Sequence, residues 1–95
     1  MSKLTVVDVA DILLDYLDYT KTDGRWCTIA DIDAHRPLTH EDKMKMTHTM
    51  RRKVMSYQGI NRRVYVLSKV KVDSRSPVTY YIARYKDMRV MANAR

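Results

Sequence analysis

Cys27 and three histidines are the side chains of this chain with the chemistry for binding a transition metal or for nucleophilic catalysis. Structural zinc sites need ligands paired at short spacing, and neither Cys27 nor His35, His40 and His48 has such a partner. Cys27 and His48 form a nucleophile–base pair in principle only, because the chain lacks a glycine-rich phosphate loop and a nucleophile-elbow motif. We therefore expect no metal, no cofactor and no enzymatic activity.

The charged residues divide the chain into an acidic part and a basic part. Residues 1–33 contain seven aspartates against three lysines and arginines, whereas residues 34–95 contain fifteen lysines and arginines against four acids. The net charge is +7. A concentrated positive field attracts polyanions and accelerates their encounter, and nucleic acid is the commonest polyanion inside cells. An acidic protein surface or an anionic membrane would respond to the same field.

The segment 39–57 carries the densest positive charge. Thr39 followed by Asp42 is typical of a helix start, and Gly59 is available to end the helix. The spacing therefore predicts a helix from about Thr39 to Tyr57, with lysines, arginines and histidines around most of its surface. Its expected apolar stripe consists of Met46, Met50, Val54 and Tyr57.

Other elements must position this basic helix. Apolar residues at helical spacing predict a helix over about 5–19, and Thr28 and Pro37 bound a short helix over about 28–35, with a short extended segment before it. From Ile60 the period changes to two, which predicts a strand, and 78–85 is a second β-rich run. The turn cluster 73–77 lies between the two runs, which are expected to pair as a hairpin. We expect one side of the first strand to carry Val64, Val66, Val70 and Val72.

Length and composition indicate one small domain. We place it at residues 1–86, with 87–95 as a basic tail that is either a frayed helix or disordered. The lone cysteine favours a reducing compartment, and acids interrupt every long apolar window near the N-terminus, so we expect neither a signal peptide nor a membrane span. The expected location is cytoplasmic, at the nucleoid or in another DNA-containing compartment. The aspartates of residues 8–18 have the spacing of a solvent-facing helical stripe.

This order of elements resembles the winged helix-turn-helix superfamily of DNA-binding domains over about residues 5–86. The resemblance rests on the order, on the segment 24–31 that enters the second helix, and on the segment 59–63 that enters the hairpin. It implies an α+β fold with three helices and a C-terminal β-hairpin. Residues 39–57 would then be a recognition helix in the major groove of duplex DNA, and residues 73–77 would be the wing.

The resemblance also implies which side chains contact nucleic acid. Residues in the N-terminal half of a recognition helix reach base edges, and arginines farther along contact phosphates. Glu41 and Asp42 depart from this pattern, since acids near phosphates weaken binding unless they cap the helix or accept from a cytosine amino group. Arg63 joins the candidates because like charge crowds the predicted hairpin. The candidates for base contacts are Thr39, His40, Lys43 and Thr47, and those for phosphate contacts are Arg51, Arg52 and Arg75; Arg63 is a further nucleic-acid-binding candidate.

The expected function is therefore a DNA-binding regulatory or accessory protein, such as a transcription regulator. Two alternatives stay open: a modulator that docks on an acidic surface of a larger protein through exposed apolar residues such as Trp26, Met88 or Met91, and an RNA-binding domain. A homodimer that contacts two DNA half-sites is a further option.

Overall fold

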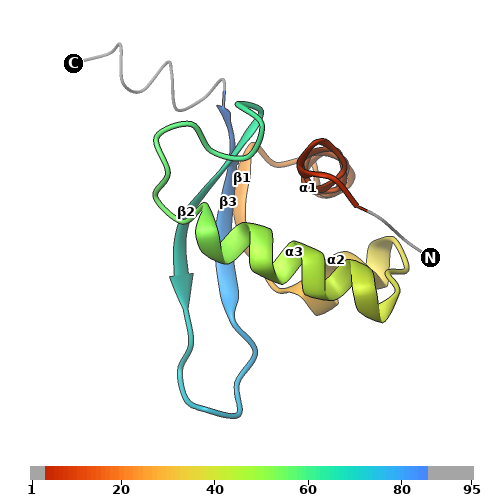
Figure 1. Cartoon of the computed structure of the whole chain (residues 1–95), viewed down its shortest axis with the longest axis vertical. Coiled ribbons are helices and arrows are strands. Elements are labelled where there is room, and N and C mark those ends of the chain that lie inside the picture. The colour runs from red at the N-terminus through yellow and green to blue at the C-terminus, as the bar shows by residue number, and fades with distance from the viewer. Residues whose placement is uncertain (1–3, 86–95) are drawn as a thin grey trace.

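Three helices and three strands follow one another in the computed structural model, which describes residues 4–85 (Figure 1). The α+β class expected from the sequence is confirmed. The predicted tail at 87–95 lies outside the described residues. The elements are α1 (Val6–Thr20), β1 (Gly24–Cys27), α2 (Ile29–His35), α3 (His40–Arg52), β2 (Val64–Val70) and β3 (Thr79–Arg84).

Each helix begins after a threonine that caps it. The threonine hydroxyl accepts from the backbone N–H of an aspartate three residues later, and that aspartate's carboxylate accepts from the backbone N–H of the threonine. Two backbone donors that lack a helical partner are satisfied in this way, and removal of such a cap typically costs about 0.5–2 kcal/mol. The helix starts predicted from the sequence are thus confirmed. The pairs are Thr5 with Asp8, Thr28 with Asp31, and Thr39 with Asp42.

The basic helix is shorter than the sequence indicated. α3 ends at Arg52, not at about Tyr57, because the chain turns toward β2 at this point. Val54 forms a bridge with Val66, and the backbone N–H of Met55 donates to the Val66 carbonyl at 2.8 Å. Met55 has a φ of 57°, which is incompatible with a continuing α-helix. Tyr57 is 88% exposed, so its expected place in the apolar stripe was wrong.

The strands form one antiparallel sheet in the order β1-β3-β2. β2 and β3 pair with each other, as expected for the two β-rich runs. The extended segment expected before the second helix is β1, which pairs along the other edge of β3. The sheet therefore has three strands among the described residues, where the sequence indicated a two-stranded hairpin. The 71–78 loop, which joins β2 to β3, projects beyond the helices (Figure 1).

A β-bulge at Leu67 reverses the faces of the second half of β2. Val66 lies opposite Ile82, whereas Ser68 lies opposite Tyr81, so β2 has one more residue than β3 between these pairs. Since side chains alternate between the two faces of a strand, one extra residue moves every later side chain to the other face.

The reversal corrects the predicted pattern of β2. Lys69 lies opposite the buried Tyr80, so these two side chains share a face. Val70 and Val72 do not share the buried face of Val64 and Val66, and Val72 is 82% exposed. The prediction that the four valines line one side was wrong because it assumed an uninterrupted period of two.

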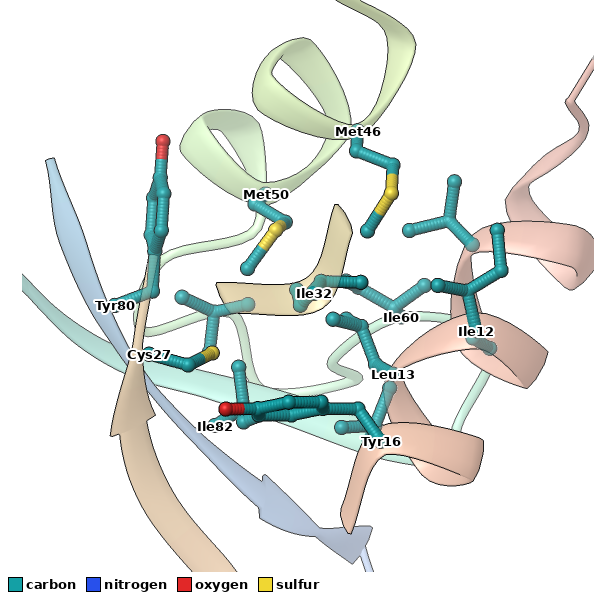
Figure 2. Packing of buried hydrophobic residues seen from close by; sticks show 14 of the residues in the cluster. Ile12, Leu13, Tyr16, Cys27, Ile32, Met46, Met50, Ile60, Tyr80 and Ile82 are labelled. Carbon is teal, nitrogen blue, oxygen red and sulfur yellow. The ribbon is translucent and has the colours of Figure 1, made fainter. Parts of the chain in front are cut away.

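One apolar cluster joins the helices to the sheet (Figure 2). Leu13 and Leu17 of α1, Ile32 of α2 and Met50 of α3 are fully buried, and Ile82 of β3 packs with them. The core therefore fixes α3 against the sheet through its apolar side and leaves its basic side outward.

None of the helices within residues 4–85 has the length and apolar character needed to span a bilayer.

Cys27 belongs to this core and should be chemically inert in the folded protein. Its side chain is buried, and burial, with a smaller contribution from the Asp31 carboxylate, raises the pKa of the thiol to about 12. Because only the thiolate reacts with disulfide reagents, we expect negligible labelling by 5,5′-dithiobis(2-nitrobenzoic acid) at pH 8. In denaturant the same reagent should label one thiol per chain at the rate of free cysteine. Equally fast labelling of the native protein would show that Cys27 is accessible.

Candidate nucleic-acid interface

α3 has a buried side that anchors it and an outer side that is cationic. Met46, Thr49 and Met50 are buried beneath the helix. Arg51 and Arg52 follow directly in the last turn and are exposed. Successive helical residues are about 100° apart around the axis, so these two arginines point to different flanks of the helix. A cleft runs along each flank.

The first cleft lies between α3 and the end of the β2–β3 pair, and we call it the α3–β2 cleft. It has a volume of about 510 Å³ and is lined by Thr47, Arg51, Lys69, Lys71 and Val78. Lys69 faces this cleft because the bulge at Leu67 moved it to the side of Tyr80. Three cations from two distant parts of the sequence therefore meet here, with no carboxylate in the lining.

The second cleft lies on the opposite flank of α3, next to the start of α1, and we call it the α3–α1 cleft. It has a volume of about 310 Å³. Its lining is again cationic and has no carboxylate, and consists of Val6, Lys45, His48, Thr49, Arg52 and Lys53. The exposed surface of α3 is thus bordered on both sides by positive charge.

The start of α3 uses its polar groups to build the helix. The Thr39 hydroxyl accepts from the Asp42 N–H, and the Asp42 carboxylate accepts from the Thr39 N–H. The capping role that the sequence allowed for Asp42 is therefore confirmed. His40 and Glu41, which follow the cap residue, are exposed.

Lys43, a predicted base contact, is held by an aspartate of α2. Its Nζ lies 3.5 Å from an Asp33 carboxylate oxygen. The other Asp33 oxygen accepts from the Leu38 backbone N–H at 2.7 Å. This backbone bond, aided by the Lys43 charge, lowers the pKa of Asp33. Lys43 thus helps to join α2 to α3, and the pair would have to open for Lys43 to reach a base.

Arg63, a predicted nucleic-acid contact, forms an ion pair with Asp11 of α1. It precedes the first residue of β2, whereas Lys69 and Lys71 lie at the other end of the strand, about 20 Å away at 3.3 Å per residue. Arg63 is therefore not brought together with the cations of the α3–β2 cleft.

The aspartates of α1 do more than form a solvent-facing stripe. Asp18 pairs with Arg84 at the end of β3, and Asp15 pairs with His35 of α2 at 2.9 Å. The Tyr19 ring stacks on His35, with the ring centres 4.0 Å apart. These contacts join α1 to the sheet and to α2, and Asp18 neutralises the positive charge of Arg84 at the end of the sheet where β2 begins.

Arg75 lies at the tip of the 71–78 loop. The Asp73 carboxylate accepts from the backbone N–H groups of Arg75 and Ser76, both at 2.8 Å, and from the Ser76 hydroxyl. These bonds, that of Arg75 first, lower the pKa of Asp73. They fix the shape of the tip and leave the Arg75 side chain exposed.

Several cations missed as candidates line the two clefts. Lys69 and Lys71 belong to the like charge of the predicted hairpin, and Lys45 and Lys53 belong to the basic surface of the predicted helix. The helical spacing of Lys45 and Arg52, seven residues apart, places them on one flank and could have signalled the α3–α1 cleft. The one sign of the bulge in the sequence is the break in alternation at Leu67 and Ser68, which does not show that Lys69 turns toward α3.

Thr47, Arg51 and Arg52 are the predicted contacts that the structure places in these clefts. Within residues 4–85 no three His, Cys, Asp or Glu side chains converge as a metal site would require. No protein-family model, curated protein or solved structure matches this chain.

Proposed function

We propose that this protein binds duplex DNA in the manner of a winged helix domain, with α3 in the major groove and the 71–78 loop against the backbone, and acts as a regulatory or accessory factor. The observation that carries the proposal is the pair of cationic clefts on the two flanks of α3. A helix bordered by positive charge on both sides is suited to a groove bordered by phosphates on both sides.

The dimensions of α3 support this placement. Its 13 residues extend over about 20 Å, and a helix with its side chains fits the major groove, which is about 12 Å wide. The flanking arginines and lysines would face the two phosphate backbones, while exposed residues between them would face the bases.

The charge of the outer side of α3 also supports the proposal. Lys45, Arg51 and Arg52 form no ion pair with a carboxylate of the residues that the structure describes. The aspartates of α1 are instead engaged with Arg63, Arg84 and His35. The positive field of α3 is therefore not cancelled by the acidic part of the chain within residues 4–85, and phosphates can replace counterions there.

The test is fluorescence anisotropy with a labelled duplex, its single strand and the matching RNA duplex, over a range of salt concentrations. We expect the tightest binding to duplex DNA and a slope of log K against log salt of about −4 to −6, for five to seven phosphate contacts. Arg51→Ala with Arg52→Ala should make the slope less steep by about 2. An unchanged slope would exclude these arginines as phosphate contacts, and tighter binding to RNA would favour the RNA alternative.

Trp26 provides the observation that favours the second candidate, docking on another protein. It is 44% exposed on β1 and contacts the edge of Tyr81, with ring centres 5.3 Å apart. Exposed tryptophans are frequent anchors of protein interfaces. Trp26→Ala should leave DNA affinity unchanged if α3 is the interface, so loss of DNA binding in this variant would overturn the assignment to α3.

A further inference from the structure

The α3–β2 cleft depends on the β-bulge at Leu67, whereas a merely basic surface needs no such irregularity in the sheet. Without the extra residue at Leu67, Lys69 would lie on the opposite face of β2, away from α3. The modification leaves Val70 and Val72 exposed, which is unfavourable for the protein alone. It brings Lys69 and Lys71 to the same cleft as Arg51, where like charges repel one another. The attraction of the three cations to an anion bound in the cleft would offset that repulsion.

A buried hydroxyl beside this cleft lacks a partner. Tyr80 is 1% exposed, and its hydroxyl oxygen has no hydrogen-bond partner among the described residues. Figure 2 shows the ring beside the Met50 turn of α3, with the hydroxyl directed away from the apolar cluster. Tyr80 lies opposite Lys69 and two residues after Val78, so it shares the face of both. Burial raises the pKa of its hydroxyl, and the Arg51 charge opposes this change. An unpaired buried hydroxyl costs stability, which a ligand acceptor would recover. Tyr80 does not itself line the cleft, so a ligand oxygen would reach this hydroxyl only after side chains of the lining move aside.

We propose that the α3–β2 cleft binds one sugar–phosphate unit of a nucleic-acid strand, with the phosphate held by Arg51, Lys69 and Lys71 and with the Tyr80 hydroxyl donating to a ligand oxygen. This inference rests on the proposed function and specifies how the strand next to the 71–78 loop is held. Thr47 supplies a further hydroxyl, and Val78 supplies an apolar wall for the sugar ring.

The size and chemistry of the cleft select this ligand. The cleft is open to solvent and has a volume of about 510 Å³, so it has room for more than a bare phosphate. Three cations and no carboxylate favour an anion with several oxygens. A nucleotide unit offers this anion together with an apolar sugar face.

The first experiment titrates thymidine 3′,5′-bisphosphate into the full chain labelled with ¹⁵N, with inorganic phosphate and thymidine as separate probes. We expect the amide signals of Thr47, Lys69, Lys71 and Val78 to shift, and the bisphosphate to bind several-fold more tightly than inorganic phosphate. Shifts centred on the α3–α1 cleft would overturn the inference. Equal affinity for inorganic phosphate would overturn the role of the sugar.

Matched variants separate this site from general electrostatics. Lys69→Gln with Lys71→Gln should weaken the bisphosphate about tenfold, whereas Lys45→Gln with Lys53→Gln, which removes the same charge from the other flank of α3, should weaken it less than threefold. Equal losses from the two pairs would overturn the inference, because they would show that only net charge matters.

Tyr80→Phe tests the buried hydroxyl. We expect this variant to bind the bisphosphate three- to tenfold more weakly, while its thermal midpoint stays the same or rises, because it removes an unpaired buried hydroxyl. If the hydroxyl had a purely structural role, its removal would instead lower the thermal midpoint. Unchanged affinity would overturn the role of Tyr80.

Duplex binding by the same variants distinguishes the inference from the proposed function. A duplex that binds equally well to Lys69→Gln/Lys71→Gln and to the parent chain overturns the inference and leaves the function intact. Bisphosphate binding in the cleft without duplex binding supports the site and overturns the function, in favour of a free nucleotide as the ligand. If neither probe binds, both proposals are overturned.

Discussion

Reversing the charge of Arg51 and Arg52 to glutamate is expected to weaken duplex binding about 100-fold or more near physiological salt. Each lost phosphate contact removes about 0.9 from the salt slope, which is roughly fivefold in affinity near physiological salt, and each glutamate adds repulsion from the backbone. The two residues lie in different clefts, so the double variant acts on both flanks of α3. Anisotropy with a labelled duplex measures the change.

The matched control reverses Lys21 and Arg62, which makes the same change in net charge. Lys21 shortly precedes β1, and Arg62 shortly precedes β2. The register places both strand starts at the end of the sheet opposite to the 71–78 loop. The control should lose less than tenfold in affinity, because it changes only the long-range field. A loss as large as that of the α3 variant would mean that no particular surface binds the duplex.

Local sequence patterns determined the helix starts well because their interactions are local. Thr5, Thr28 and Thr39 each cap a helix with an aspartate three residues later, so the whole interaction lies within four residues of sequence. No other part of the fold has to be known for such a pattern to form. The helix starts, and the place of Thr39 at the start of the basic helix, follow from this.

The bulge in β2 could not be predicted from β2 alone. Valines at 64, 66, 70 and 72 fit the period of two of an ordinary strand, and the alternation is broken only at Leu67 and Ser68, which does not by itself define an extra residue. The extra residue is defined by the pairing of Val66 with Ile82 and of Ser68 with Tyr81, which involves a strand farther along the chain. The α3–β2 cleft, which depends on this bulge, was therefore beyond the reach of the sequence.

Long-range ion pairs determine where positive charge remains exposed. Arg63 and Asp11 are 52 residues apart, and Arg84 and Asp18 are 66 apart, so no local pattern connects them. The acidic helix α1 thus neutralises cations at one end of the sheet. The basic residues of α3 keep their charge on the two flanks of the helix. The exposed positive charge of the basic half of the sequence is therefore concentrated along α3.

Replacing Met50 by alanine is expected to lower the free energy of unfolding by about 2–5 kcal/mol, since a buried methionine loses its apolar contacts and leaves a cavity. Met50 is completely buried and packs α3 against the core. Met44 on the same helix is 60% exposed, so Met44→Ala should change stability by less than about 0.5 kcal/mol. Urea unfolding followed by circular dichroism measures both.

The Met50 variant also links the core to the function. A domain of this size is stable by only about 5–15 kcal/mol, so the loss could remove half of its stability. Duplex binding by Met50→Ala should then fall with rising temperature well before that of Met44→Ala, since the two clefts exist only while α3 is held against the sheet. A loss below 1 kcal/mol for Met50→Ala would contradict the packing of α3 described above, and with it the geometry of both clefts.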